Sequence, residues 1–413
     1  MAPRRLGPHE VASALPRGGR TLVAGCSGES LLFAEAVMRA GHALGAMTFT
    51  GIFVPGLNTR TYLANPDCRV ETFFLTPELK AAGDAVAFLP LGYGDILARL
   101  RAVPIDAALF MATPPDPDGL CGFGPVVDFL ADLWPKIPVR IAHINPLMPN
   151  ARGSTGIPFR ELTAYVEGEQ SLLNFPDAGS DPVMEEIARN VAKWIGDGAT
   201  IETGLGKLPT AALGALKGRR GLKIHSGLIG EAVVDLEEAG ALADGRAVTG
   251  GVAVGSNRLY DAVGGPQYWF EPVSYTHSPR VIIEIENFVA LNSAVEVDLV
   301  GQGYAEMGPQ GLMSGPGGAS DFARAAWCAG GLRIVALPAS AARGAISRIV
   351  APNAGAGPIL LGRMDTDVVV TEFGSADLRG LSYHDRAVAL TAIASPNHRR
   401  SLEDAWAKFA AKF

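Results

Sequence analysis

The sequence predicts an α/β protein with two domains, each built on a mostly parallel open sheet covered by helices. Short apolar runs bounded by Gly, Pro or Asp alternate with helical runs, which is typical of parallel strands joined by helical crossovers. A strand, a glycine turn and a helix also follow one another in similar order near residue 20 and again near residue 200. The 413 residues are enough for two domains of about 200 residues each.

The two similar openings suggest an internal duplication. Residues 19–25 read GRTLVAG and residues 198–204 read GATIETG, with Gly, Thr and Gly at the same offsets. Each precedes an Ala-rich helical run, SLLFAEAVMRAG (30–41) or LPTAALGALKG (208–218). The pattern favours two α/β domains with the same start. The alternative is that any strand–turn–helix unit of an α/β protein has such a sequence.

The remaining elements follow from apolar periodicity and from turn residues. A helix is predicted over residues 182–198, and the polar stretch FPDAGSDP (175–182) is the predicted linker. This places an N-terminal domain at 1–182 and a C-terminal domain at 183–413. Further predicted strands are residues 107–112, 139–144, 281–285, 333–337 and 367–371.

Composition narrows the class of partner. The net charge of −7 argues against binding to nucleic acid or to an anionic membrane. Cys26, Cys68, Cys121 and Cys328 are far apart without CxxC spacing, so we expect neither a zinc site nor a disulfide framework, and a reduced, cytoplasmic protein. The N-terminus lacks the continuous apolar segment of a signal peptide, and no run of 18 apolar residues suggests a membrane span.

Two glycine turns are candidate ligand sites. Gly204-Leu205-Gly206 follows a predicted strand and opens a helix, where backbone N–H groups and the helix N-terminus favour an anion. A dinucleotide-binding GxGxxG motif is disfavoured because Pro209 occupies its third glycine position. The second turn, SGPGGA (314–319), can present consecutive N–H groups to an oxyanion. A plain structural turn is the alternative for both.

Several polar side chains lie in or near predicted strands. Glu372 ends a very apolar strand, and its alternative is a surface or helix-capping role. Arg348, next to Ser347, is suited to pair with a phosphate or carboxylate, or to form an interdomain salt bridge. His225 lies in a predicted strand-to-helix turn, where a single histidine is more often structural. Residues 292–302, NSAVEVDLVGQ, alternate polar and apolar residues, so we interpret Glu296 and Asp298 as the polar face of a half-exposed strand.

These motifs together resemble the acetyl-CoA hydrolase and CoA-transferase family. The resemblance is carried by residues 204–236, 292–302 and 314–322 and by VVTEFGSADLRG (369–380). It implies that both domains are CoA-transferase-like and that the Leu205 N–H helps form an oxyanion hole. It also implies that Asn292 contacts the acyl group and that Glu372 lies near the substrate. The implied partners are CoA or an acyl-CoA and a small carboxylic acid, in a homo-oligomer without metal. Candidate CoA-binding residues are Gly204, Leu205, Gly206, Gly315, Gly317, Gly318, Ser347 and Arg348.

The sequence departs from this family where the chemistry is expected. The resembling proteins carry a nucleophilic glutamate two residues after the histidine that matches His225, and this chain has Gly227 there. Ala319 stands where they have Gln, and Asn150 where they have Arg. We therefore expect an acyl-transfer enzyme without a glutamyl-CoA intermediate, with Glu372, Asn292, His225 and the vacant position Gly227 at its catalytic site. Its reaction would be thioester hydrolysis, direct acyl transfer or CoA-dependent cleavage of a β-keto acid.

Two alternatives remain. In the first, a conventional CoA-transferase has moved its nucleophile to Glu231, four residues along the chain. In the second, the protein is a non-catalytic homologue that binds acyl-CoA.

Overall fold

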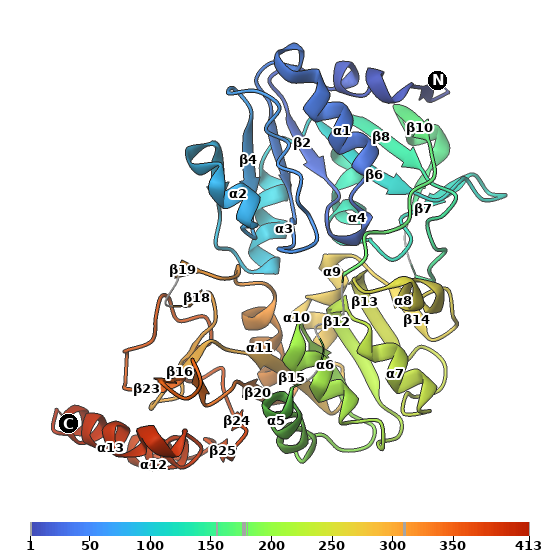
Figure 1. Cartoon of the computed structure of the whole chain (residues 1–413). Helices are drawn as coiled ribbons and strands as arrows, with labels where there is room; N and C mark the ends of the chain where they lie inside the picture. The colour runs from blue at the N-terminus through green and yellow to red at the C-terminus, as the bar shows by residue number, and fades with distance from the viewer. Residues whose placement is uncertain (1, 154–155, 176–178, 180, 309–310, 413) are drawn as a thin grey trace. The chain divides into compact units, whose positions relative to one another are not determined.

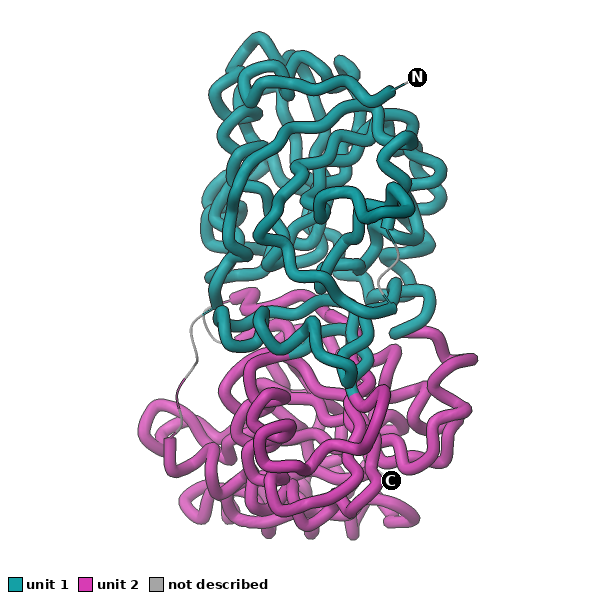
Figure 2. The backbone as a smooth tube through the Cα atoms, turned by 90° about the vertical axis from the view of Figure 1, so that its right-hand side faces the viewer, with its two compact units in different colours: residues 1–177, 227–229, 248–276 teal, residues 178–226, 230–247, 277–413 magenta. Residues whose placement is uncertain are grey.

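The computed structural model describes residues 2–153, 156–175, 179, 181–308 and 311–412. Within it the chain forms two compact units (Figure 2). Unit 1 consists of residues 1–177, 227–229 and 248–276, and unit 2 of residues 178–226, 230–247 and 277–413. The predicted linker, 175–182, includes residues 176–178 and 180, which lie outside the described residues. The two-domain division at 182/183 stays a prediction.

Unit 1 is built on an eight-stranded parallel sheet with the order β1-β10-β8-β6-β2-β3-β4-β5 (Figure 1). All six residues of β6 are buried, as expected for a strand of a parallel sheet covered on both faces. Its strands are β1 (Arg4–Arg5), β2 (Arg20–Val23), β3 (Thr48–Gly51), β4 (Arg69–Thr72), β5 (Val86–Phe88), β6 (Ala107–Ala112), β8 (Val139–Ile144) and β10 (Ala164–Glu167).

The other elements of unit 1 are short. β7 (Leu120–Gly122) and β9 (Gly156–Pro158) pair in antiparallel fashion, whereas β13 (Val248–Ala253) and β14 (Tyr268–Phe270) pair in parallel. The helices are α1 (Leu31–Ala40), α2 (Pro77–Ala81), α3 (Tyr93–Ala102), α4 (Leu130–Leu133), α8 (Asn257–Ala262) and α9 (Val273–Thr276).

Unit 2 contains a second parallel sheet, in which neighbours follow the order β12-β11-β15-β20-β24-β25 and only β25 is antiparallel. Helix α11 packs against β15 and β20, and α5 packs against β20 and β24. The strands are β11 (Thr200–Thr203), β12 (Lys223–Ile229), β15 (Phe288–Ser293), β20 (Leu332–Ala336), β24 (Val368–Thr371) and β25 (Gly374–Asp377). The helices are α5 (Pro182–Ala192), α6 (Lys207–Gly214), α7 (Ala232–Glu238), α10 (Pro279–Ile282), α11 (Ala319–Cys328), α12 (Tyr383–Ala392) and α13 (Arg399–Ala410).

Small sheets complete unit 2. A three-stranded sheet is formed by β17, β16 and β23, and two two-stranded sheets pair β18 with β19 and β21 with β22. Their bounds are β16 (Glu296–Asp298), β17 (Gly303–Tyr304), β18 (Met307–Gly308), β19 (Gly311–Leu312), β21 (Ser340–Ala341), β22 (Ile346–Ser347) and β23 (Ile349–Val350).

The predicted fold class is confirmed, because mostly parallel sheets covered by helices form the bulk of the chain (Figure 1). The two similar openings also form equivalent elements. β2 lies between β3 and β6, with β8 and β10 following beyond β6. β11 lies between β12 and β15, with β20 and β24 following beyond β15. The two sheets therefore share a strand order around their first long strand, as a duplication predicts.

One predicted strand is wrong. Residues 281–285 lie in α10 and the turn after it, and the strand of this region is β15, which begins at Phe288. Pro279 occupies the first turn of α10 after Ser278, and both residues favour a helix start. Ile282 is buried beside Phe288. A short apolar run cannot by itself distinguish a buried helical turn from a strand.

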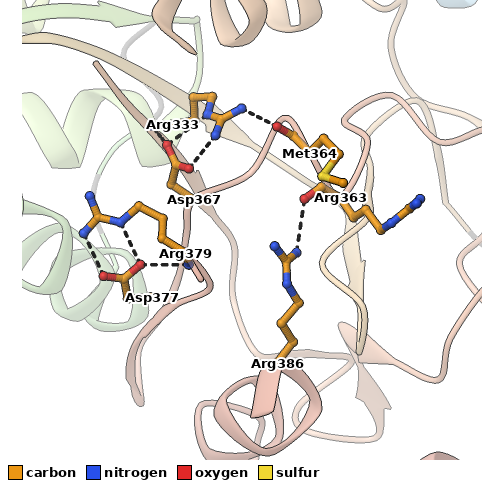
Figure 3. A network of polar contacts seen from close by, with 7 residues as sticks. All are labelled: Arg333, Arg363, Met364, Asp367, Asp377, Arg379 and Arg386. Carbon is orange, nitrogen blue, oxygen red and sulfur yellow. Dashed lines mark hydrogen bonds and ion pairs between the residues drawn. The ribbon is translucent and has the colours of Figure 1, made fainter. Parts of the chain in front are cut away.

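Arginine contacts fix the amino ends of β20 and β24 (Figure 3). Arg333 donates through Nε and Nη2 to the Asp367 carboxylate at 2.9 and 2.5 Å, and both side chains are buried. The Arg386 guanidinium donates to the carbonyls of Val300 and Arg363 at 3.2 and 3.1 Å. A buried, bidentate ion pair specifies one alignment of the two strands. It therefore also determines where their carboxyl ends lie.

The glycines that close the two similar openings differ, because packing requires glycine only at the first of them. An added Cβ at Gly25 would lie 1.9 Å from the Ile52 carbonyl oxygen, so only glycine fits there. An added Cβ at Gly204 would meet no atom of the described residues within 4 Å. Packing therefore demands glycine at the first turn and leaves the second turn open.

We predict that Gly25→Ala lowers the free energy of unfolding by about 3 kcal/mol or more, because the methyl group must displace backbone. Gly204→Ala is the matched control and should stay within about 1 kcal/mol of the unmodified protein. Urea unfolding followed by circular dichroism measures both. Equal stability of the two variants would contradict the close approach at Gly25.

Candidate functional site

The carboxyl ends of four parallel strands, β11, β15, β20 and β24, lie at one edge of the unit 2 sheet. In open α/β sheets, ligands bind at this edge. Gly204 follows β11, His225 lies in β12, Asn292 lies near the end of β15 and Glu372 follows β24. The parallel register thus brings Gly204, Asn292 and Glu372 to one edge although they are far apart in the sequence, and it places His225 within the sheet, one step before the end of β11.

Glu202, which the sequence analysis did not single out, is hydrogen-bonded to Asn292. The Asn292 Nδ2 atom donates to Glu202 Oε2 at 3.3 Å, and the Leu291 backbone N–H also donates to this carboxyl group. Glu202 is only 4% exposed. Burial raises its pKa from 4.5 to about 8, and the two hydrogen bonds oppose that rise only in part. The carboxyl group is therefore mostly protonated at neutral pH.

His225 and Glu202 lie side by side on one face of the unit 2 sheet. Thr200 and Ile201 of β11 pair with Lys223 and Ile224 of β12, so one step further along this register His225 stands beside Glu202. The His225 ring meets Phe288 edge-on at 6.3 Å. Residues side by side in neighbouring strands point to the same face, so His225 and Glu202 share the face of the sheet that Phe288 occupies.

His277 adjoins this face through Phe322, whose ring lies 4.6 Å from it. Burial, and to a lesser extent His225, lowers the pKa of His277 to about 3, so its imidazole is neutral. An added Cβ at Gly318 would lie 2.7 Å from His277 Nε2, so the start of α11 closes directly on this ring. The structure therefore joins the predicted His225, Asn292 and Gly318 to two residues that were not predicted.

The two glycine turns have backbone conformations that favour glycine. Gly206 has φ +125° and precedes α6, and Gly317 has φ +62°. Among the residues that the structure describes, no atom lies within 4 Å of a Cβ added at Gly204 or Gly206, so they do not fill the space next to this turn. Binding of CoA by these turns, including Leu205 and Gly315, stays a prediction.

Gly227 lies inside β12, where the chain passes from unit 2 to unit 1. In unit 2, the preceding Ser226 donates its hydroxyl to the Thr203 carbonyl at 2.7 Å. In unit 1, an added Cβ at Gly251 would lie 2.9 Å from the Gly227 carbonyl oxygen. The Ser226 side chain and the Gly227 carbonyl group thus each have a close neighbour within their own unit. A nucleophile missing from position 227 stays a prediction.

Glu372 is anchored by the loop that follows β20. Its Oε2 accepts the Ala339 backbone N–H at 2.8 Å, and its side chain is half-buried. One carboxylate oxygen is thereby held in place, and the neighbouring strands β20 and β24 determine where it lies. A role for Glu372 in the reaction stays a prediction.

Arg348 already has a carboxylate partner. Its Nη1 lies 3.4 Å from Glu296 Oε1 within unit 2, and both side chains are largely buried. Glu296 Oε2 also accepts the Ala356 N–H at 2.8 Å, and the Ser347 hydroxyl donates to the Ile349 carbonyl at 2.6 Å. The charge that would attract a CoA phosphate is compensated in this state. Contact of Ser347 and Arg348 with CoA stays a prediction.

The interpretation of Glu296 and Asp298 as a half-exposed face is wrong. They are 6% and 0% exposed, and β16 has only three residues. Asp298 accepts hydrogen bonds from the backbone of Val300 and from the backbone and side chain of Gln302. Donors from folded loops thus satisfy both carboxylates inside the protein. Alternation along one segment cannot reveal such donors.

The internal repeat carries a signal that would have found Glu202. At the same offset in the first opening stands Val23, an apolar residue of β2. An acid in a central strand, where the duplicate has valine, is unusual, because Glu is rarely buried without a partner. No comparable signal in the sequence marks His277.

Two negative observations hold for the described part of the chain. No helix there is long and apolar enough to cross a membrane. No group of three or more His, Cys, Asp or Glu side chains in that part is arranged to hold a metal ion.

Glu202 should make stability depend on pH. Its folded pKa of about 8 lies above its ordinary 4.5, so the folded state retains a proton that the unfolded chain releases. The stability associated with the neutral acid is complete below about pH 4.5 and is lost as pH rises toward 8. Wild type should lose about 5 kcal/mol of stability over this range, and we predict that Glu202→Gln, which cannot ionise, does not show this loss. Urea unfolding at several pH values measures it, and parallel pH profiles for the two proteins would contradict the raised pKa.

Comparison with known proteins gives consistent results. Residues 255–406 match the family model for the acetyl-CoA hydrolase/transferase C-terminal domain. The chain is 35% identical over 320 residues to 4-hydroxybutyrate coenzyme A transferase from Clostridium kluyveri, covering 76% of this chain and 75% of that protein.

Two solved structures are similar over nearly the whole chain. The crystal structure of RipA from Yersinia pestis has a TM-score of 0.91 at 26% identity and covers 98% of each chain. The structure of 4-hydroxybutyrate CoA-transferase from Porphyromonas gingivalis has a TM-score of 0.81 at 28% identity, covering 99% of this chain and 98% of the other.

Proposed function

We propose a specific reaction class for this chain, which belongs to the acetyl-CoA hydrolase and CoA-transferase family. Homologues of the family support an acyltransferase or hydrolase acting on CoA thioesters. The finer proposal is that this enzyme transfers an acyl group between CoA and a carboxylic acid, or to water, without a glutamyl-CoA intermediate. The observation that carries it is Gly227, which has no side chain at the position to which the family resemblance assigns the nucleophilic glutamate.

The proposed chemistry takes place with both reactants bound. A carboxylate or water attacks the thioester carbonyl, the C–S bond breaks and CoA leaves as a thiolate. In transfer, the thiolate then attacks the second carbonyl of the mixed anhydride and releases the first acid. In cleavage of a β-keto acid, the CoA thiolate attacks the keto carbonyl, and the departing carbanion takes up a proton. Every route creates an oxyanion, which backbone N–H groups can stabilise.

The residues of the site have separate proposed roles. The glycine turns at 204–206 and 315–318 would bind the thioester end of CoA and donate N–H groups to the oxyanion. Asn292 would contact the acyl carbonyl, and Glu372 would orient the second reactant. His225 would line the site as a buried side chain. These roles rest on the family resemblance and on the shared carboxyl edge of the unit 2 strands.

Homologues named as CoA-transferases support CoA or an acyl-CoA and a small carboxylic acid as the partners. We also propose a cytoplasmic homo-oligomer with the domains 1–182 and 183–413, as the sequence predicts.

The first test is a covalent trap. We predict that incubation with acetyl-, butyryl-, succinyl- or 4-hydroxybutyryl-CoA and then hydroxylamine labels no glutamate, because the position of the nucleophile is glycine. Peptide mass spectrometry detects the hydroxamate, and turnover of the same thioesters is followed by release of CoA thiol.

The Glu231→Gln variant is the matched control. If Glu231 is labelled and the variant abolishes both label and turnover, the enzyme is a conventional transferase with a relocated nucleophile. If no thioester is turned over while CoA still binds in titration calorimetry, the protein is an acyl-CoA-binding homologue instead.

The second test refills position 227. We predict that Gly227→Glu and Gly227→Gln both lower the native turnover at least about 100-fold, because each side chain occupies space that the second reactant needs. Only Gly227→Glu can form a thioester, so only this variant can gain hydroxylamine-sensitive transferase activity. Steady-state rates at saturating acyl-CoA measure both. Unchanged turnover in the two variants would show that the missing glutamate is incidental.

A further inference from the structure

We infer that Glu202 is a positioning residue of the proposed reaction, and that its carboxyl group holds the Asn292 amide so that a second N–H faces the acyl carbonyl. The inference rests on the proposed function, because Asn292 has its role only there. It concerns a residue that the family resemblance did not single out.

Glu202 and Asn292 differ in how accessible they are to a ligand. Glu202 is buried behind Asn292, and the Asn292 side chain is only partly buried. A ligand can therefore reach Asn292 more readily than Glu202. The Nδ2 atom carries two hydrogens, and the contact with Glu202 at 3.3 Å uses one. The carboxyl group thus fixes the amide plane and leaves one donor for a ligand.

The charge of the Glu202 carboxyl group affects the stability of an oxyanion near Asn292. A carboxylate behind Asn292 would repel the oxyanion that forms when the thioester is attacked, whereas a neutral acid would not. The protein supplies little that would ionise Glu202, since its described hydrogen-bond donors are an amide side chain and the Leu291 N–H. Burial raises its pKa to about 8. The arrangement is therefore suited to an acid that stays protonated through neutral pH.

The ionisable groups around Glu202 come from three directions. His225 stands beside it on β12, and His277 lies beyond His225 before α10. On β20, Arg333 is level with Glu202 across Ala290 of β15 and points to the same face according to the register, but its guanidinium is bound to Asp367. His277 is neutral through the physiological range, because its pKa is lowered to about 3. A change near pH 8 is thus assigned to Glu202 and can be separated from His225 by substitution.

Two substitutions distinguish a positioning role of Glu202 from a role as proton donor. Glu202→Gln keeps the shape, the neutral charge and an oxygen that accepts the Asn292 N–H, but it has no proton to transfer. Glu202→Ala removes the contact. A positioning residue tolerates the first change and not the second, whereas a catalytic acid tolerates neither. A residue that only fills space leaves the pH dependence of the rate unaltered in both variants.

The experiment measures kcat/KM with the four acyl-CoAs named above from pH 6 to pH 9. We expect wild-type kcat/KM to fall above about pH 8 and that of Glu202→Gln to stay within about threefold of wild type at pH 7 without that fall. We expect Glu202→Ala and Asn292→Ala each to lose about 100-fold, and the double variant to lose no more than either. The His225→Asn variant should still show the fall of kcat/KM above about pH 8, even if its kcat/KM at pH 7 is lower than that of wild type.

Three outcomes would overturn the inference: a Glu202→Gln rate as low as that of Glu202→Ala, a Glu202→Ala rate equal to wild type, or an alkaline fall that persists in Glu202→Gln. Infrared difference spectroscopy supplies a readout without turnover. The wild-type spectrum should show a protonated-carboxyl band that disappears near pH 8 and is missing from Glu202→Gln. An absence of this wild-type band would refute the inference even if Glu202→Ala fails to fold.

Failure of the proposed function has a different signature. If wild type turns over none of the thioesters while the infrared band titrates near pH 8, the reaction class is wrong and the neutral acid is real. Asn292 then has no acyl carbonyl to contact, so the positioning role of Glu202 is refuted together with the proposed reaction.

Discussion

The parallel register of unit 2 is the constraint on which its candidate site depends. β11 pairs with β12 on one side and with β15 on the other, and all three strands run in the same direction. This alignment places the carboxyl ends of segments from three parts of the sequence at one edge. The Arg333–Asp367 ion pair fixes the next strands, β20 and β24, at their amino ends. A shift of one residue in any of these pairings would turn the polar side chains to the opposite face.

The cost of burying Glu202 is a second constraint. An unpaired carboxylate in such a site would be strongly unfavourable, so the group retains its proton. The hydrogen bonds from Asn292 and Leu291 satisfy the carboxyl group without introducing a cation. Stability and electrostatics are therefore linked, because the burial that raises the pKa of this acid is also what removes a negative charge from the vicinity of Asn292.

Glycine has several different functions in this chain. At Gly25 and Gly318, an added Cβ would collide with the Ile52 backbone or with the His277 ring, so packing requires glycine. At Gly206 the positive φ requires it. At Gly204 neither reason applies, which makes the surroundings of that turn the more open of the two equivalent turns. The same letter in two copies of a repeat thus reflects separate physical demands.

The sequence alone determined the fold class, the similar openings and the order of most elements, because buried parallel strands and amphipathic helices have local patterns. It also selected Asn292, His225 and the glycine turns, since their motifs are contiguous and resemble a family.

Tertiary structure decided the rest. The partners of Glu296 and Asp298 come from loops up to 60 residues away, so alternation misplaced both side chains at the surface. Residues 281–285 form a helical turn because Ser278 and Pro279 start it and Phe288 covers it. Glu202 becomes a proton-retaining group only when strands that are 90 residues apart in sequence bring Asn292 against it and exclude water. Protonation state and hydrogen-bond partners are properties of an assembled environment, which no single segment contains.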